Sequence, residues 1–145
     1  MTKILFVCHG NICRSAMAEY MMKDLVKNAG AAERYEIDSA AVSTEEIGNP
    51  VYAPARNELR RHGIDCAGHH ARQITRRDLG YFDRIYYMAG SNERWLGRMF
   101  PKDWEKKCRR LLDRDVADPW DTGDFGATWA DLCEGLQRIL EETTA

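Results

Sequence analysis

A cysteine followed six positions later by an arginine has the chemistry to bind a phosphate group and attack its phosphorus. The pair is Cys8 and Arg14, within the stretch VCHGNICRSAMAE at residues 7–19. The backbone N–H groups of residues 9–14 would surround a tetrahedral anion, helped by the positive end of a following helix. The Arg14 guanidinium can bind two of the anion's oxygens at once. In this positive field Cys8 is expected to be a thiolate, which is the nucleophilic form.

The residues around this pair suit a tight anion-binding loop. Gly10 and Asn11 are residue types that tolerate the left-handed backbone conformation such a loop requires. Ser15 could donate a hydrogen bond to the sulfur and help it leave later. Cys13 lies five residues from Cys8 around the same loop, so we predict a reversible disulfide between them under peroxide. The expected phosphate-binding residues are His9, Gly10, Asn11, Ile12, Cys13 and Ser15.

The spacing alone is not specific, because three of the five cysteines are followed by an arginine six positions later. Cys66 precedes Arg72, and Cys108 precedes Arg114, at this spacing. The segment 66–72 follows a turn-like stretch, and the segment 108–114 contains a candidate strand of its own. Only Cys8 has a buried strand before it, Gly-Asn in the loop and an amphipathic helix after it. A free cysteine is most often a small buried residue, but this context favours the anion-binding loop.

A phosphoryl-transferring cysteine also needs an acid, because the alkoxide or phenoxide leaving group must be protonated. Asp118 stands out in VADPWDTGD at residues 116–124, where Pro119 follows it directly. The proline makes the following turn rigid and withholds one N–H donor. An Asp-Pro turn without chemistry is the simpler interpretation of this segment taken alone. Beside the cysteine loop, Asp118 becomes the candidate general acid.

The elements that must position these residues alternate between strand and helix patterns. A continuous apolar run over residues 4–7 predicts a strand buried on both faces. The alternation favours a parallel sheet with right-handed crossovers and helices on both faces. Ligands bind beyond the carboxyl ends of such strands, where the cysteine loop falls. The expected strands are residues 4–7, 35–42, 83–88 and 109–112, and the expected helices are residues 14–29, 54–62, 91–100 and one that runs through 125–139.

Length and composition describe an ordinary globular chain. Its 145 residues suit one domain spanning residues 1–145. The net charge of −2 argues against a nucleic-acid or membrane partner. The first apolar run is too short for a signal peptide or a membrane span, so the cytoplasm is the expected compartment. The five cysteines form no CxxC pair and are expected as free thiols. No metal is expected, since the spacing of Cys8, His9 and Cys13 does not suit zinc.

Two motifs far apart in the chain, VCHGNICRSAMAE and the late ADPW, occur with further motifs between them. Together they resemble the low-molecular-weight protein tyrosine phosphatases, over essentially the whole chain. The signature around the first cysteine is specific to this family and its arsenate-reductase relatives. The resemblance implies an α/β three-layer sandwich, a four-stranded parallel sheet flanked by helices with the phosphate loop between strand 1 and helix 1. The intervening motifs are DSAAVSTEEIGNPVY, HGID, GHHARQIT, FDRIYYM and SN.

The resemblance also implies an activity and a role for each residue. The activity is hydrolysis of phosphotyrosine in protein substrates through a cysteinyl-phosphate intermediate, with no cofactor. Cys8 would be the nucleophile and Arg14 would hold the phosphate. Asp118 would be the general acid and then the base that activates water. Four residues fall on family positions that support the loop by hydrogen bonds: Asn11, Ser15, Ser39 and His69.

Departures from the family pattern concern the choice of substrate and leave the reaction intact. Ala16 stands where a proline usually opens the first helix, and Ala89 replaces a common aspartate. Glu45 occupies a position where some members carry an aromatic wall of the cleft, and Asp121 replaces an aromatic residue after Trp120. We therefore expect an acidic rim with one aromatic face, which favours phosphotyrosine flanked by basic residues.

Three alternative functions share the cysteine loop. Protein arginine phosphatases tend to carry threonine where this chain has Ile12, and isoleucine favours the aromatic ester. Arsenate reductases need a further cysteine pair, whereas the other cysteines here are far apart in sequence and none lies near residues 83–88. Cysteine phosphocarrier subunits of sugar uptake systems have no use for an acid such as Asp118. The tyrosine phosphatase is the main prediction.

Overall fold

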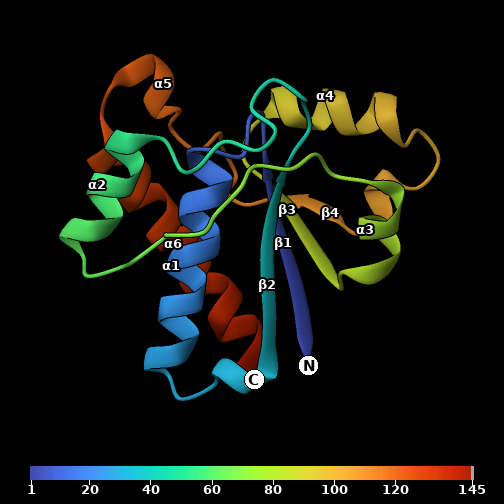
Figure 1. Cartoon of the computed structure of the whole chain (residues 1–145). Helices are drawn as coiled ribbons and strands as arrows, with labels where there is room; N and C mark the ends of the chain where they lie inside the picture. The colour runs from blue at the N-terminus through green and yellow to red at the C-terminus, as the bar shows by residue number, and fades with distance from the viewer. Residues whose placement is uncertain (145) are drawn as a thin grey trace.

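The computed structural model describes residues 1–144 and contains one sheet of four parallel strands (Figure 1). The strand order is β2-β1-β3-β4, so the first strand lies inside the sheet. Each connection between parallel strands crosses through at least one helix or 3-10 turn. The predicted α/β class with a four-stranded parallel sheet is confirmed. The strands are β1 (Thr2–Cys8), β2 (Tyr35–Ala41), β3 (Arg84–Tyr87) and β4 (Cys108–Arg110).

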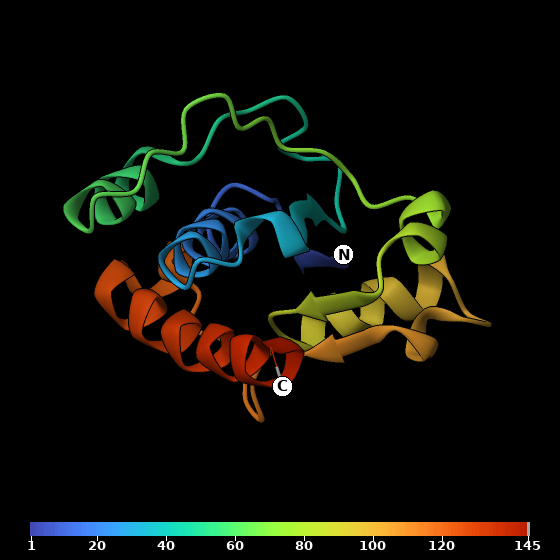
Figure 2. The ribbon, with the colours of Figure 1, turned by 90° about the horizontal axis from the view of Figure 1, so that it is seen from below.

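Helices cover both faces of this sheet. Figure 2 shows α1, α2 and α6 on one side and α3 and α4 on the other. Two short helices, α3 and α5, lie in segments for which the sequence predicted no element. The helices are α1 (Arg14–Asn28), α2 (Ala53–Arg61), α3 (Arg76–Tyr81), α4 (Gly90–Met99), α5 (Pro119–Thr122) and α6 (Phe125–Thr144), with 3-10 turns η1 (Ala32–Arg34) and η2 (Trp104–Lys106).

The central strand β1 is buried on both of its faces. Ile4 and Phe6 belong to the hydrophobic core formed with α1, α2 and α6. Leu5 and Val7 belong to the second core, formed with α3 and α4. All four side chains are fully buried. Because both faces need apolar side chains, the run is continuous and does not alternate with polar residues.

Helix α6 approaches the sheet closely and also holds α2. A Cβ added at Gly135 would lie 2.5 Å from Cγ of Leu111, so the close approach requires a residue without a side chain. Trp129 of α6 stacks on His62, which follows α2, with ring centroids 3.6 Å apart and planes 5° from parallel. These contacts hold α2 and α6 together on one side of the sheet.

The strand-to-helix turn that carries the cysteine motif lies at the carboxyl end of the sheet. β1 ends at Cys8 and α1 begins at Arg14. The segment after β2 runs alongside, because Val42 N donates to Cys8 O at 3.0 Å and Ser43 N donates to His9 O at 3.1 Å. Over residues 1–144, none of the helices combines the length and the apolar character that a membrane span requires.

Candidate active site

A cavity of about 280 Å³ opens above the turn between β1 and α1. The cavity brings Cys8 and Arg14 together with Asp118, which lies 104 residues after Arg14 in the chain. The structure therefore places the three residues expected to do chemistry in one site. The full lining is Cys8, His9, Gly10, Ile12, Cys13, Arg14, Glu45, Glu46, Ser91, Asp118 and Trp120.

The Cys8 sulfur has two hydrogen-bond partners in the cavity. Asn11 N donates to Cys8 Sγ at 3.3 Å, and the Ser15 hydroxyl lies 3.0 Å from the same sulfur. Donors aimed at a sulfur stabilise its negatively charged form. The side chain lies at the N-terminus of a fifteen-residue helix, whose dipole favours negative charge as well.

Arg14 lies beside Asp118 at the wall of the cavity. The guanidinium is almost fully buried; Nη1 donates to Val116 O at 3.2 Å, and Nη2 lies 3.4 Å from Asp118 Oδ2. The other oxygen, Asp118 Oδ1, accepts from Trp120 N at 3.0 Å and so caps α5. The Asp118 side chain remains 35% exposed, so it can reach both water and a bound molecule.

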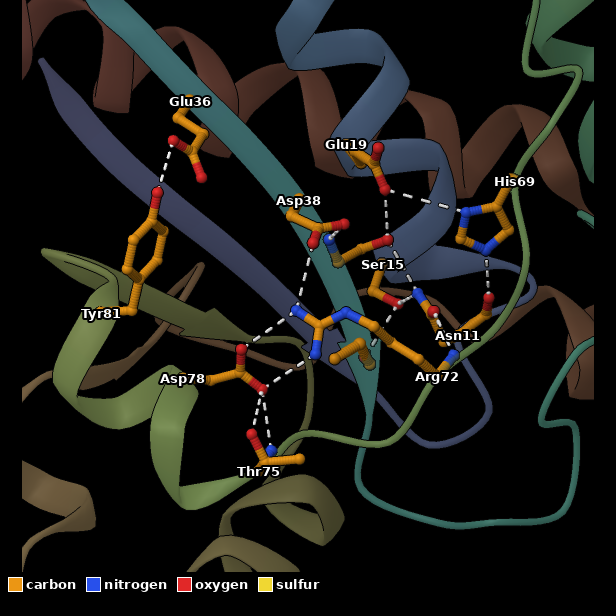
Figure 3. A network of polar contacts seen from close by, with 12 residues as sticks. Asn11, Ser15, Glu19, Glu36, Asp38, His69, Arg72, Thr75, Asp78 and Tyr81 are labelled. Atoms are coloured by element: carbon orange, nitrogen blue, oxygen red, sulfur yellow. Dashed lines mark hydrogen bonds and ion pairs between the residues drawn. The ribbon is translucent and has the colours of Figure 1, made fainter.

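Asn11 fixes the conformation of the loop. It is fully buried and has a φ of 62°, the left-handed region that side-chain-bearing residues rarely occupy. Its Nδ2 donates to both Ser15 Oγ and Ser39 Oγ, each at 2.9 Å (Figure 3). Ser15 belongs to α1 and Ser39 to β2, so both hydrogen-bond acceptors are held by regular elements. These hydrogen bonds offset the cost of the left-handed backbone conformation.

A buried carboxylate that the sequence did not indicate supports this network. Ser39 Oγ donates to Glu19 Oε1 at 2.5 Å, and Lys23 Nζ donates to Glu19 Oε2 at 2.5 Å. His69 completes the set: its Nε2 donates to Asn11 O at 2.8 Å and its Nδ1 lies 3.8 Å from Glu19 Oε1 (Figure 3). The only signal in the sequence was a glutamate on the apolar side of the predicted helix 14–29.

The second cysteine of the loop has a different chemical character. Burial raises the pKa of the Cys13 thiol to about 12. Cys13 is therefore a neutral thiol near pH 7, although it lines the same cavity. Burial likewise raises the pKa of the Cys108 thiol to about 11, far from the cavity in the core beneath α4.

Two glutamates give the cavity an acidic part of its lining. Glu45 and Glu46 both line the cavity, and Glu45 Oε2 lies 3.1 Å from His9 Nε2. Gly10 makes room for the second glutamate, since a Cβ there would lie 3.2 Å from Glu46 Cγ. Glu45 was expected at the rim, whereas Glu46 was not, because loop side chains carry no periodic pattern that would assign their direction.

An aromatic side chain also lines the cavity. Trp120 lines the cavity and is 62% exposed. Its ring centroid lies 4.9 Å from that of Tyr52, and Tyr52 lies 6.3 Å from Phe125. Asp121, which the sequence also placed at the rim, is exposed on α5 and is not one of the residues lining the cavity.

A cysteine at the base of a strand-loop-helix anion site, with an arginine and a carboxylate above it, defines the class of cysteine-dependent phosphatases. Comparison with known proteins narrows this class. The family model described as "Low molecular weight phosphotyrosine protein phosphatase" matches residues 3–145. The chain belongs to this family. Over residues 1–144, no group of three or more His, Cys, Asp or Glu side chains is placed to hold a metal ion.

Individual relatives cover nearly the whole chain. The low molecular weight phosphotyrosine protein phosphatase of Rattus norvegicus is 48% identical over 97% of this chain and 94% of its own length. YfkJ of Bacillus subtilis, a low molecular weight protein-tyrosine-phosphatase, is 37% identical over the same shares. The YfkJ crystal structure superposes with a TM-score of 0.95 at 36% identity, covering 99% of this chain and 95% of that one. The Drosophila arginine phosphatase DARP has a TM-score of 0.87 at 28% identity, covering 99% of each chain.

Proposed function

We propose that this protein tyrosine phosphatase hydrolyses phosphotyrosine in protein substrates with Cys8 as nucleophile, Arg14 as phosphate ligand and Asp118 as general acid and base. The observation that carries the proposal is the shared cavity: Cys8 and Asp118 both line it, and Arg14 contacts the Asp118 carboxylate. A phosphate bound between them would have the sulfur on one side and a proton donor on the other. This is the arrangement that in-line transfer requires.

In the first step the Cys8 sulfur attacks phosphorus. An S–P bond forms, the bond from phosphorus to the tyrosine oxygen breaks, and Asp118 gives its proton to that oxygen. The backbone N–H groups of residues 9–14 and the Arg14 guanidinium balance the charge on the phosphate oxygens. The products are a cysteinyl-phosphate and a neutral tyrosine side chain.

In the second step water replaces the sulfur. Asp118, now a carboxylate, accepts a proton from the water as its oxygen bonds to phosphorus. The S–P bond breaks and the electron pair returns to Cys8. Ser15, 3.0 Å from the sulfur, donates a hydrogen bond to the departing thiolate. Inorganic phosphate leaves and the enzyme is restored.

Phosphotyrosine fits the cavity better than the alternative substrates do. Ile12 provides an apolar wall and Trp120 an exposed aromatic face, both suited to a phenol ring. The similarity to DARP makes phosphoarginine the second candidate, to be compared directly. Arsenate reduction is disfavoured because Cys66 and Cys108 are buried in cores on opposite faces of the sheet. A phosphocarrier would leave Asp118 without a role.

We also propose that the protein works in a reducing compartment such as the cytoplasm, without nucleic-acid, membrane or metal partners. All five cysteines are free thiols in the structure. A nucleophilic thiolate must stay reduced to act, which agrees with such a compartment. The macromolecular partners are then the phosphotyrosine-containing proteins that serve as substrates.

The test is phosphate release from phosphotyrosine, phosphoarginine and para-nitrophenyl phosphate in the presence of a chelator. Cys8→Ser should lose turnover but still bind vanadate, because most of the cradle is backbone. Arg14→Ala should lose both, and Arg14→Lys should recover little, since an ammonium cannot replace a bidentate guanidinium. Substantial turnover by Cys8→Ser would refute the mechanism, and faster release from phosphoarginine would reassign the substrate.

A further inference from the structure

Arg72 lies between two carboxylates just outside the phosphate-binding loop (Figure 3). Its Nη2 donates to Asp38 Oδ2 at 3.1 Å. Its two terminal nitrogens donate to the two oxygens of Asp78, at 2.9 and 3.2 Å, in a bidentate pair. A lysine could not make this set of contacts, because it presents a single nitrogen. The guanidinium therefore joins β2 to α3.

Both carboxylates are themselves held in place. Asp38 Oδ1 accepts from the backbone N of Ser39 at 2.8 Å. Asp78 Oδ2 accepts from Thr75 N at 2.8 Å and Thr75 Oγ1 at 3.2 Å, which caps the first turn of α3. Arg72 thus belongs to a network with fixed members and is more than an isolated surface ion pair, which would contribute little.

The backbone of Arg72 reaches the active site directly. Its N–H donates to Asn11 Oδ1 at 3.2 Å, and its carbonyl accepts from Ala41 N at 2.7 Å. Asn11 in turn donates to Ser15 Oγ, which lies 3.0 Å from Cys8 Sγ. A continuous chain of contacts therefore runs from the Arg72 guanidinium and its carboxylates to the sulfur.

The Arg72 N–H decides which way the Asn11 amide faces. With Oδ1 held by that donor, both hydrogens of Nδ2 point to hydroxyl oxygens, those of Ser15 and Ser39. Because Ser15 Oγ accepts from Asn11, its own hydrogen can go to the Cys8 sulfur at 3.0 Å, a shorter contact than its other acceptor, Ala40 O, at 3.4 Å. The reversed amide would present Oδ1 to Ser15 and draw that hydrogen away from the sulfur.

We propose that Arg72 is a positioning residue of the phosphate-binding loop. Its side chain, held by Asp38 and Asp78, fixes the backbone N–H that orients Asn11 and, through Ser15, stabilises the thiolate of Cys8. Arg72 itself touches neither substrate nor sulfur. The inference rests on the proposed function, since it concerns the same nucleophile.

The experiment compares Arg72→Ala and Arg72→Lys with a control, Arg76→Ala. Arg76 lies four residues further on and also donates to one carboxylate, Asp103, at 2.8 Å, but has no contact with the loop. Two quantities are measured on folded protein at a temperature well below the melting transition. They are the dissociation constant for inorganic phosphate and the pH at which Cys8 is half as reactive toward iodoacetamide as its maximum, read by mass spectrometry of its peptide.

Arg72→Ala should bind phosphate about fivefold more weakly, the effect of weakening one buried hydrogen bond. Its midpoint for Cys8 alkylation should move to higher pH, because the sulfur loses a well-directed donor. Arg72→Lys should fall between this variant and the wild type. Arg76→Ala should match the wild type in both measurements, even where its melting temperature drops.

A folded Arg72→Ala protein with wild-type phosphate affinity and alkylation midpoint would overturn the inference. If that variant does not fold, Arg72→Lys and Asp38→Asn decide by the same two measurements. Failure of the proposed function would be seen without any change at Arg72, as turnover that survives the single substitution Cys8→Ser. If Cys8→Ser loses turnover but Arg72→Ala has the same phosphate affinity and alkylation midpoint as Arg76→Ala, the positioning role alone is rejected.

Discussion

Replacing Asp118 separates three contributions that the structure combines in one carboxylate. It is the proposed proton donor, it contacts Arg14 at 3.4 Å, and it caps α5 through Trp120 N at 3.0 Å. Asp118→Asn keeps an oxygen for the cap but cannot donate or accept the catalytic proton. Asp118→Ala loses the cap as well, which costs about 1 kcal/mol of stability. The contact with Arg14 is partly exposed, so its loss should cost no more than about 1 kcal/mol.

The catalytic loss should depend on the leaving group. General acid catalysis contributes roughly 10²- to 10⁴-fold to a rate. The phenol of tyrosine, with a pKa of about 10, needs a proton to leave, whereas para-nitrophenol is a better leaving group. For Asp118→Asn we expect kcat/KM to fall by at least about 10²-fold on a phosphotyrosine peptide, and much less on para-nitrophenyl phosphate. The ratio kcat/KM is the right quantity because it reports the steps up to formation of the cysteinyl-phosphate.

The assay is phosphate release from both substrates at a single pH, with urea unfolding as the measure of stability. Equal losses on the two substrates would refute the assignment of Asp118 as the acid. Such a result would mean that Asp118 acts only structurally, by capping α5.

Four further predictions concern packing, redox chemistry and the rim. Gly135→Ala should lower the free energy of unfolding by about 1–3 kcal/mol in urea without changing KM, because the added Cβ would lie 2.5 Å from Leu111 Cγ; unchanged stability would mean that α6 moves freely. Burial raises the pKa of the Cys13 thiol from 9.0 to about 12, so above pH 9 the unfolded chain releases a proton that the folded one keeps. The free energy of unfolding should therefore fall between pH 9 and 12, and should fall less in Cys13→Ser. After peroxide treatment the wild type should regain activity with dithiothreitol through a Cys8–Cys13 disulfide, and Cys13→Ser should regain far less; equal recovery would exclude the disulfide. A phosphotyrosine peptide with basic flanks should have a higher kcat/KM at low salt than one with acidic flanks, and Glu45→Gln should narrow the gap, whereas absence of a gap would leave the acidic rim without a function.

Elements with a strong local pattern could be predicted from the sequence, and elements without one could not. The strand β1 and the helix α1 follow from an apolar run and a 3.6-residue period that need no knowledge of the rest of the chain. Helix α3, of six residues, is too short to show a period, although its Thr75 and Asp78 form a capping box. The fourth strand is confirmed but shifted, at Cys108–Arg110 in place of residues 109–112, since three residues on a sheet edge carry little pattern.

The active site likewise has a part that could be predicted from the sequence and a part that could not. The loop is contiguous, so its cysteine, arginine and turn residues could be recognised together. The supporting residues Glu19, Asp38 and Asp78 come from separate elements, and nothing in one sequence shows that they converge. Arg72 appeared only as a chance partner of Cys66 at the spacing of the motif. Its significance depends on which carboxylates the fold places beside it, and that is a tertiary property.

The contacts of Arg14 also bear on how the enzyme comes into being. They reach Val116 and Asp118, 102 and 104 residues further along the chain. During synthesis Cys8 emerges long before those residues exist, and contacts over such separations form late in folding. Until they form, the Arg14 guanidinium lacks the partners that hold it at the cavity, and the proposed acid is not beside it. The supports of the Cys8 loop lie within residues 8–72 and exist earlier, so the cysteine loop can be built before the acid joins it.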